Sequence, residues 1–203
     1  MTGLEMNIVF QILGIIILLA FYGCYFAKMI SQKKKGIQTD QMGKGKVGFT
    51  KVIEVTMKIT TFIVPIVEVV SIVLDTSHIP VGARTIGMCI GFIGVVVFVT
   101  SVLTMRDSWR AGVSETDKTD LVTEGIYQIS RNPAFLGFDL VYIGILLMFF
   151  NWILFVVSLL AMILFHLQII NVEEDFLVKT FGDEYIKYKK KVNRYLGRKR
   201  DRR

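Results

Sequence analysis

Two polar segments in the second half of the chain carry the residue types and spacings best suited to chemistry. In the first, residues 121–127 are followed by Arg131, Asn132 and Pro133. Proline at the first position of a helix loses no hydrogen bond, and the asparagine before it can cap the helix. The free N–H groups and positive dipole end of such a helix can hold a carboxylate or a phosphate. A capped membrane helix with an interfacial arginine would explain the same residues.

The second segment places three acids, Glu173, Glu174 and Asp175, directly after an apolar run. Residues 181–188, which include Gly182, then resume an amphipathic surface. A helix lying along lipid headgroups would account for the lysines of this region, but it would not account for the acids. Because the end of a membrane span facing the cytoplasm is normally basic, the acidic triplet indicates a cationic ligand or a basic partner.

The elements that position these segments are long apolar blocks. Hydrophobic residues make up 53% of the 203 residues, and they gather in runs long enough to span a bilayer of about 30 Å. We therefore predict an all-α fold, a polytopic membrane bundle of about five transmembrane helices. A cleaved signal peptide is the alternative for the first block, but its lysines follow the block rather than precede it. The five predicted spans cover residues 7–27, 52–74, 84–105, 134–150 and 153–170.

Charge gives the predicted orientation, because basic loops stay in the cytoplasm. The loop 28–51 and the tail 171–203 hold most of the Lys and Arg, while the turns near Asp75 and Asn151 hold none. We predict a multi-pass protein with its N-terminus outside and its C-terminus cytoplasmic. The net charge of +7 fits contact with membrane lipids, so no nucleic-acid partner is expected.

Several smaller features complete these predictions. The glycines of the loop 28–51 predict a flexible connection, and Glu54 and Lys58, one helical turn apart, are expected to pair. Glu68 lies deeper in its block and should face protein or water rather than lipid, in a hydrogen bond between helices or near the outer interface. Cys24 and Cys89 are expected to be buried free thiols, and no metal site is expected. The glycines Gly87, Gly91 and Gly94 form a stripe suited to close helix packing.

Several motifs in one order now resemble a known family. They are Leu-Val-x-x-Gly-Ile-Tyr (121–127), Arg-x-Pro-x-x-x-Gly (131–137), an apolar hairpin, Glu-Glu (173–174) and Phe-Gly-Asp-Glu-Tyr-x-x-Tyr (181–188). This series resembles the isoprenylcysteine carboxyl methyltransferases and the related phospholipid N-methyltransferases of membranes. The resemblance covers roughly residues 121–196. Together with the predicted spans, it divides the chain into an N-terminal part, residues 1–105, with three spans and the basic loop, and a methyltransferase-like region, residues 106–203.

The resemblance implies a membrane methyltransferase that uses S-adenosyl-L-methionine, bound at the cytoplasmic C-terminal region. Its acceptor would be a hydrophobic or lipid molecule from the bilayer, methylated on a carboxyl oxygen or an amine. The start of the fourth span, with Arg131, would receive the cofactor's carboxylate, and Glu173 or Glu174 its ammonium group. Backbone around residues 121–127 would hold the adenosine. The implied catalytic residues are Arg131, Asn132 and Glu174, and the implied cofactor-binding residues are Leu121, Val122, Gly125, Ile126, Tyr127, Arg131, Asn132, Pro133, Glu173, Glu174 and Tyr185.

The chain also departs from the family pattern. Asn132 stands where the family usually has histidine, and residues 166–171 contain no arginine to orient an acceptor carboxylate. His166 or Gln168 could take over acceptor contacts, although a lone histidine within a span more often packs against another helix. Two alternatives therefore stay open. One is a catalytically inactive membrane scaffold, and the other is an NADPH-dependent reductase of the sterol type.

Overall fold

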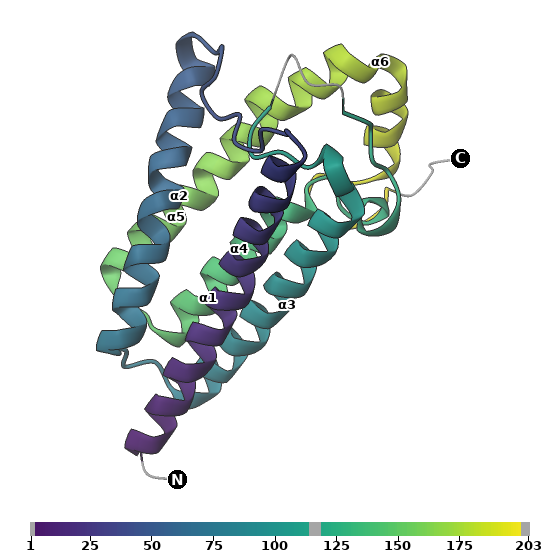
Figure 1. Cartoon of the computed structure of the whole chain (residues 1–203). Helices are drawn as coiled ribbons and strands as arrows, with labels where there is room; N and C mark the ends of the chain where they lie inside the picture. The colour runs from purple at the N-terminus through teal and green to yellow at the C-terminus, as the bar shows by residue number, and fades with distance from the viewer. Residues whose placement is uncertain (1–2, 114–118, 200–203) are drawn as a thin grey trace.

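A computed structural model describes residues 3–113 and 119–199 of the chain, and the fold in this part is built from helices. Figure 1 shows a bundle in which the N-terminus, the α2–α3 turn and the α4–α5 turn lie at one end, while α6 and the longer connections lie at the other. The latter end is called the α6 end below. The elements are α1 (Gly3–Lys34), α2 (Gly48–Leu74), α3 (Val81–Met105), η1 (Arg106–Ser108), η2 (Gly125–Gln128), α4 (Pro133–Met148), α5 (Trp152–Gln168), η3 (Ile169–Glu173) and α6 (Glu174–Lys191).

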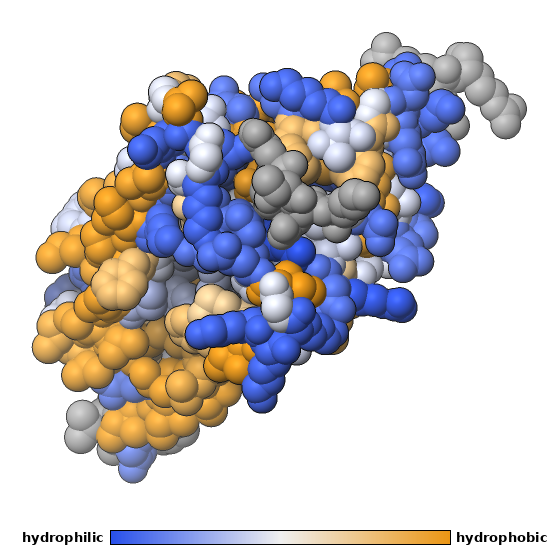
Figure 2. Space-filling view, turned by 45° about the horizontal axis from the view of Figure 1, so that its top comes forward, coloured by the Kyte–Doolittle hydropathy of each residue, from blue (hydrophilic) through white to orange (hydrophobic). Residues whose placement is uncertain are grey.

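The predicted all-α polytopic bundle is confirmed, with four helices of spanning length in residues 3–113 and 119–199 where about five spans were predicted. Among the described residues, α1, α2, α3 and the continuous run from α5 into α6 are each long and apolar enough to cross a bilayer, and α4 is a shorter apolar helix. Exposed apolar side chains cover the part of the molecule that lies away from the α6 end (Figure 2). Hydrophilic residues gather at the α6 end itself. This division is the one expected when lipid surrounds the bundle and water meets its end.

The predicted glycine stripe is where α3 and α4 pack most closely. A methyl group added at Gly144 of α4 would lie 2.5 Å from the backbone nitrogen of Gly91, and one added at Gly94 would lie 2.8 Å from the nitrogen of Val141. The two backbones therefore touch directly, which is how small residues join helices in a membrane. This contact fixes the start of α4 relative to the end of α3.

Buried polar contacts join the other helices. Arg84 donates to Asp75, the residue that follows the end of α2, and to Asn7 of α1, each at 3.0 Å. Tyr22 of α1 donates to Glu68 at 2.9 Å, so the prediction that Glu68 does not face lipid is confirmed, and its surroundings are protein. Cys24 and Cys89 are free thiols, as expected, but the prediction that both are buried is wrong, because Cys24 is half-buried and Cys89 is exposed on the surface of the bundle.

The loop predicted to be flexible is held in place. Helix α1 continues to Lys34, well beyond the predicted end at Ala27. The backbone of the following loop then pairs with residues 109–111, since Gln41 donates to the carbonyl of Ala111 at 2.8 Å and Ala111 donates to that of Thr39 at 3.0 Å. The partners are about 70 residues apart in the chain, so local glycine content could not predict this pairing.

The predicted pair between Glu54 and Lys58 is wrong, and the same loop is the reason. Lys58 forms its ion pair with Asp40, and Glu54 accepts a hydrogen bond from the backbone N–H of Gly43 at 2.6 Å. Glu54 also accepts from Gln168 of α5 at 3.1 Å. Glu54 and Lys58 therefore bind residues of the α1–α2 loop and do not pair with each other.

The α3–α4 contact leads to a test of stability. Replacing Gly144 with alanine forces a methyl group into the backbone of α3, and we expect it to lower the free energy of unfolding by about 1–3 kcal/mol. The measurement is thermal unfolding in detergent. Gly23→Ala is the matched control, because a methyl group there meets nothing within 4 Å. Equal unfolding temperatures for the two variants would contradict the close packing.

Candidate active site

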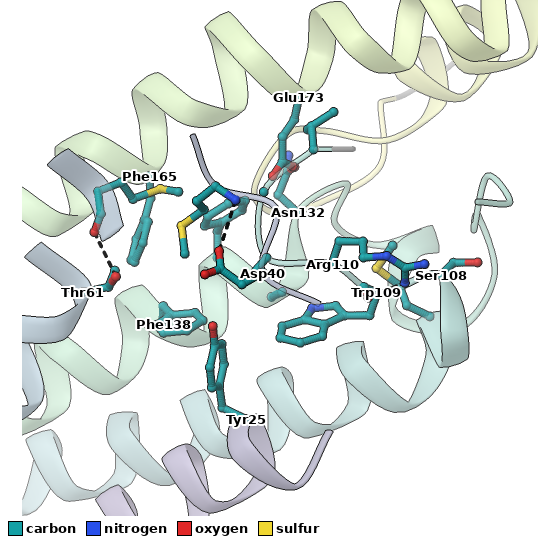
Figure 3. Close-up of a pocket in the computed structure, with 18 of the residues that line it drawn as sticks. Tyr25, Asp40, Thr61, Ser108, Trp109, Arg110, Asn132, Phe138, Phe165 and Glu173 are labelled. Carbon is teal, nitrogen blue, oxygen red and sulfur yellow. Dashed lines mark hydrogen bonds between the residues drawn. The ribbon is translucent and has the colours of Figure 1, made fainter. Parts of the chain in front are cut away.

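A cavity of about 860 Å³ opens among α1, α2, α4 and α6 at the α6 end. Figure 3 shows Asn132 and Glu173 on one side of it, with the rings of Tyr25, Trp109 and Phe138 on another. The cavity thus joins a polar end to an aromatic wall. Residues from both polar segments singled out in the sequence line it, although about 40 residues separate them in the chain.

Most of the predicted site residues reach this cavity. Its lining includes Leu121, Val122, Tyr127, Arg131, Asn132, Glu173 and Tyr185. Four others lie outside the lining: Gly125 faces Thr104 of α3, Ile126 is in η2, Pro133 begins α4, and Glu174 points to a set of cations. The predicted roles of all of these residues remain predictions.

Glu174 is buried among three cations. Its carboxylate accepts from Arg194 and Lys189, each at 2.7 Å, and lies 3.1 Å from an Nη atom of Arg131. Arg194 follows α6, Lys189 is near the end of α6, and Arg131 lies in the segment before α4. The hydrogen bond to Glu174 also raises the pKa of Arg194, which therefore stays cationic. Glu174 is saturated by the protein itself.

Glu173 is in a different position although it is the neighbouring residue. It lines the cavity, and within the described part of the chain its carboxylate has no hydrogen bond or ion pair. Glu173 ends the π-helix η3, and Glu174 begins α6. The two carboxylates consequently point to different surroundings, and Glu173 is the one open to a ligand.

Arg131 is positioned from several directions. Its Nη1 donates to the hydroxyl of Tyr185 at 2.7 Å, and its Nε donates to the carbonyl of Val192 at 3.2 Å. A guanidinium group has five N–H donors in a planar fork. Glu174, Tyr185 and Val192 orient this fork, and the remaining N–H groups can still meet an anion.

The start of α4 follows the prediction in part. Pro133 occupies the first helical position, as expected. Asn132 occupies the capping position, but its side chain makes no cap and donates instead to the carbonyl of Arg194 at 3.0 Å. The amide therefore holds the tail. The backbone N–H groups of Ala134 and Phe135, in the first turn, have no partner within the helix and lie at the cavity.

Tyrosines complete the polar end. Tyr188 donates to the carbonyl of Tyr127 at 2.6 Å, and the hydroxyl of Tyr127 shares a hydrogen bond of 2.8 Å with Ser101. Burial raises the pKa of the Tyr127 phenol well above its usual value. The phenol of Tyr127 therefore stays neutral, and its ring lines the cavity.

Neither residue suggested for acceptor contacts lines the cavity. His166 shares a hydrogen bond of 2.6 Å with Tyr195, and Gln168 donates to Glu54. Sequence reasoning missed Lys58, Asp40 and the aromatic wall formed by Tyr25, Trp109, Phe138 and Phe165. The sequence pattern marks the aromatic residues as core, so only the fold shows that they face a cavity.

Comparison with known proteins now bears on this site. A sequence profile described as phospholipid methyltransferase matches residues 83–184, half of the chain. The chain belongs to this family. The matched region runs from α3 into α6 and includes Arg131, Asn132, Glu173 and Glu174. Helices α1 and α2 and residue Arg194 lie outside the matched region. Family membership and the four apolar spans found in residues 3–113 and 119–199 make the chain an integral membrane protein.

Individual relatives carry a more specific name. The chain is 39% identical over 72 residues to a protein-S-isoprenylcysteine O-methyltransferase of Schizosaccharomyces pombe and 40% identical over 72 residues to that of Saccharomyces cerevisiae, in each case over 36% of this chain and 30% of the relative. It is 29% identical over 108 residues to form B of Arabidopsis thaliana, over 52% of this chain and 55% of the relative. The matches thus span about a third to a half of the relatives' length.

The cluster around Glu174 leads to a second test of stability. Glu174→Gln leaves Arg131 buried without its counter-charge, so we expect a loss of about 3 kcal/mol, the low end for a broken buried pair because Lys189 and Arg194 are partly exposed. Thermal unfolding in detergent measures it. Asp175→Asn, which removes an exposed carboxylate from the next position, should leave the unfolding temperature unchanged. A Glu174 variant as stable as this control would contradict a structural role.

Proposed function

We propose that the protein is an S-adenosylmethionine-dependent methyltransferase that acts on a hydrophobic acceptor from the bilayer. One observation carries the proposal. A single cavity joins the open carboxylate of Glu173 to the lipid-exposed walls of α1 and α2. Such a cavity suits a charged, water-soluble cofactor at one end and a lipid-like molecule at the other.

The residues at the polar end fit this cofactor. Glu173 would receive the ammonium group, and the first-turn N–H groups of α4, together with Arg131, would receive the carboxylate. Backbone around Leu121, Val122 and residues 125–127 would hold the adenosine. Glu174, predicted as catalytic, is better placed as a positioning residue, because its cations already saturate it.

The acceptor's route runs through the membrane-facing wall. Several cavity-lining side chains are also open to the surroundings of the bundle: Phe26 at 51%, Ile59 at 55%, Phe62 at 72% and Ile66 at 54%. All four lie within α1 or α2, at the level of the spans. A hydrophobic molecule can therefore pass from lipid into the cavity between α1 and α2 without crossing water.

The chemistry asked of the protein is mainly positioning. When bound, S-adenosylmethionine supplies a methyl group activated by its sulfonium. Tyr25, Trp109, Phe138 and Phe165 keep bulk water from the acceptor, and a dry, ordered site gives most of the rate in such a transfer. The names of the relatives make a prenylated cysteine carboxylate one candidate acceptor, and Lys58 is a cation at the cavity that could meet it. An amine-bearing lipid is the other candidate.

We also propose that the α6 end faces the cytoplasm. Residues 28–51 and 171–199 lie toward this end, and they hold most of the lysine and arginine of the chain. Basic connections near the ends of spans remain on the cytoplasmic side. This orientation places the cofactor end of the cavity where S-adenosylmethionine is available.

The first test is binding. Calorimetric titration of the detergent-solubilised protein with S-adenosylhomocysteine should give saturable binding, and Glu173→Gln should weaken it about tenfold or more, because a charge-assisted hydrogen bond contributes about 1.5–3 kcal/mol. Asp175→Asn is the control and should bind as the wild type does. Thermal unfolding of both variants should be unchanged, since neither residue has a partner in the described part of the chain.

Other outcomes separate the alternatives. Absence of binding up to millimolar S-adenosylhomocysteine would contradict the proposal, and competition by NADPH would favour the reductase. Binding without transfer to either a prenylcysteine or an amine lipid would favour the inactive scaffold. Transfer to one of these acceptors, followed with a labelled methyl group, would identify the acceptor class.

A further inference from the structure

The last described segment, residues 192–199, wraps around the loop that leads into α4, and it is called the strap below. Figure 1 shows the chain turning back after α6 toward the start of α4. Successive carbonyls of the strap accept hydrogen bonds from this loop: Arg131 donates to Val192 and Asn193, and Asn132 donates to Arg194. The strap thereby holds the two residues at the polar end of the cavity.

Backbone hydrogen bonds join the strap to itself and to the loop before α4. Asn193 donates to the carbonyl of Gly197 at 2.9 Å, and Gly197 donates to that of Ile129 at 2.8 Å. Leu196 and Ile129 therefore sit on adjacent backbone segments, and their side chains are 67% and 51% exposed. Two large apolar side chains thus stand out from a region that is otherwise polar.

The surroundings of these two side chains are basic. Residues 187–199 contain seven Lys or Arg and no Asp or Glu. Two of the basic residues, Lys189 and Arg194, form ion pairs with Glu174. Apolar side chains among Lys and Arg are the pattern of a segment that lies at an anionic lipid surface.

The position of the strap brings it to that surface. The ring of Tyr195 stacks on His166 near the end of α5, and the two share a hydrogen bond of 2.6 Å. His166 is exposed and follows the exposed apolar residues Val156, Leu160 and Ile163 on the same helix. The strap therefore meets the bundle where its lipid-facing surface ends, at the level of the headgroups.

We propose that the strap docks on the anionic surface of the surrounding bilayer and that docking stabilises the Arg131–Glu174 cluster. Leu196 and Ile129 enter the headgroup region while Arg198 and Lys199 meet anionic headgroups. The carbonyls of residues 192–194 and the guanidinium of Arg194 carry the effect to Arg131 and Glu174. A bilayer that favours the docked strap then favours an assembled site, and the coupling is reciprocal. The proposal is independent of the cofactor and of the acceptor.

The test is amide hydrogen exchange of the full chain in nanodiscs of phosphatidylcholine alone or mixed with phosphatidylglycerol. We expect residues 129–132 and 192–199 to exchange at least about fivefold more slowly in the anionic discs, because one basic residue near such a surface contributes this much. High salt should remove the difference. Equal exchange in the two kinds of disc would overturn the proposal.

Two variants make the test specific. The triple variant Leu196→Gln, Arg198→Gln and Lys199→Gln should lose the difference between discs, and an unchanged unfolding temperature in detergent would show that it still folds. The control variant, Lys33→Gln with Lys34→Gln, removes two exposed charges from the end of α1 and should keep the difference. A difference that persists in the triple variant would also overturn the proposal.

Discussion

The carboxylate of Glu174 holds together three parts of the chain that form the polar end of the cavity. Its partners are Arg131 before α4, Lys189 near the end of α6 and Arg194 of the strap. Each cation would repel the others without it, and Arg131 is almost fully buried. A buried charge without a partner is strongly destabilising, so the arrangement is stable only as a set. The path of the tail and the orientation of the Arg131 fork both depend on this one group.

Saturation of Glu174 is also what leaves Glu173 open. The two residues differ by one position, yet the π-helix that ends at Glu173 separates their surroundings. A π-helical turn inserts a residue relative to the α-helix and is frequent at functional sites. One acid thus neutralises the protein's own cations, and the other lines the cavity. The acidic triplet noticed in the sequence therefore divides into a structural residue, an exposed residue and a residue suited to a ligand.

Much of the fold followed from the sequence, because apolar length and small-residue spacing are local properties. The five helices, the glycine stripe, Pro133 at the start of α4 and the inward direction of Glu68 were predicted in this way. Features that depend on distant partners could not be predicted. The loop around Asp40 is held by α2 and by residues 109–111, and Asn132 gives its amide to the tail rather than to the helix. Which of two adjacent acids faces the cavity depends on a π-helix that no residue pattern indicated.

The structure of the protein in a lipid nanodisc with S-adenosylhomocysteine would test the central claim most directly. The account predicts the ligand inside the cavity, its ammonium group within hydrogen-bond distance of Glu173 and its carboxylate at the start of α4. The Glu174 cluster should be unchanged, and the thioether sulfur should face the aromatic wall. A ligand bound outside the cavity, or an ammonium group that displaces Arg131 from Glu174, would contradict it.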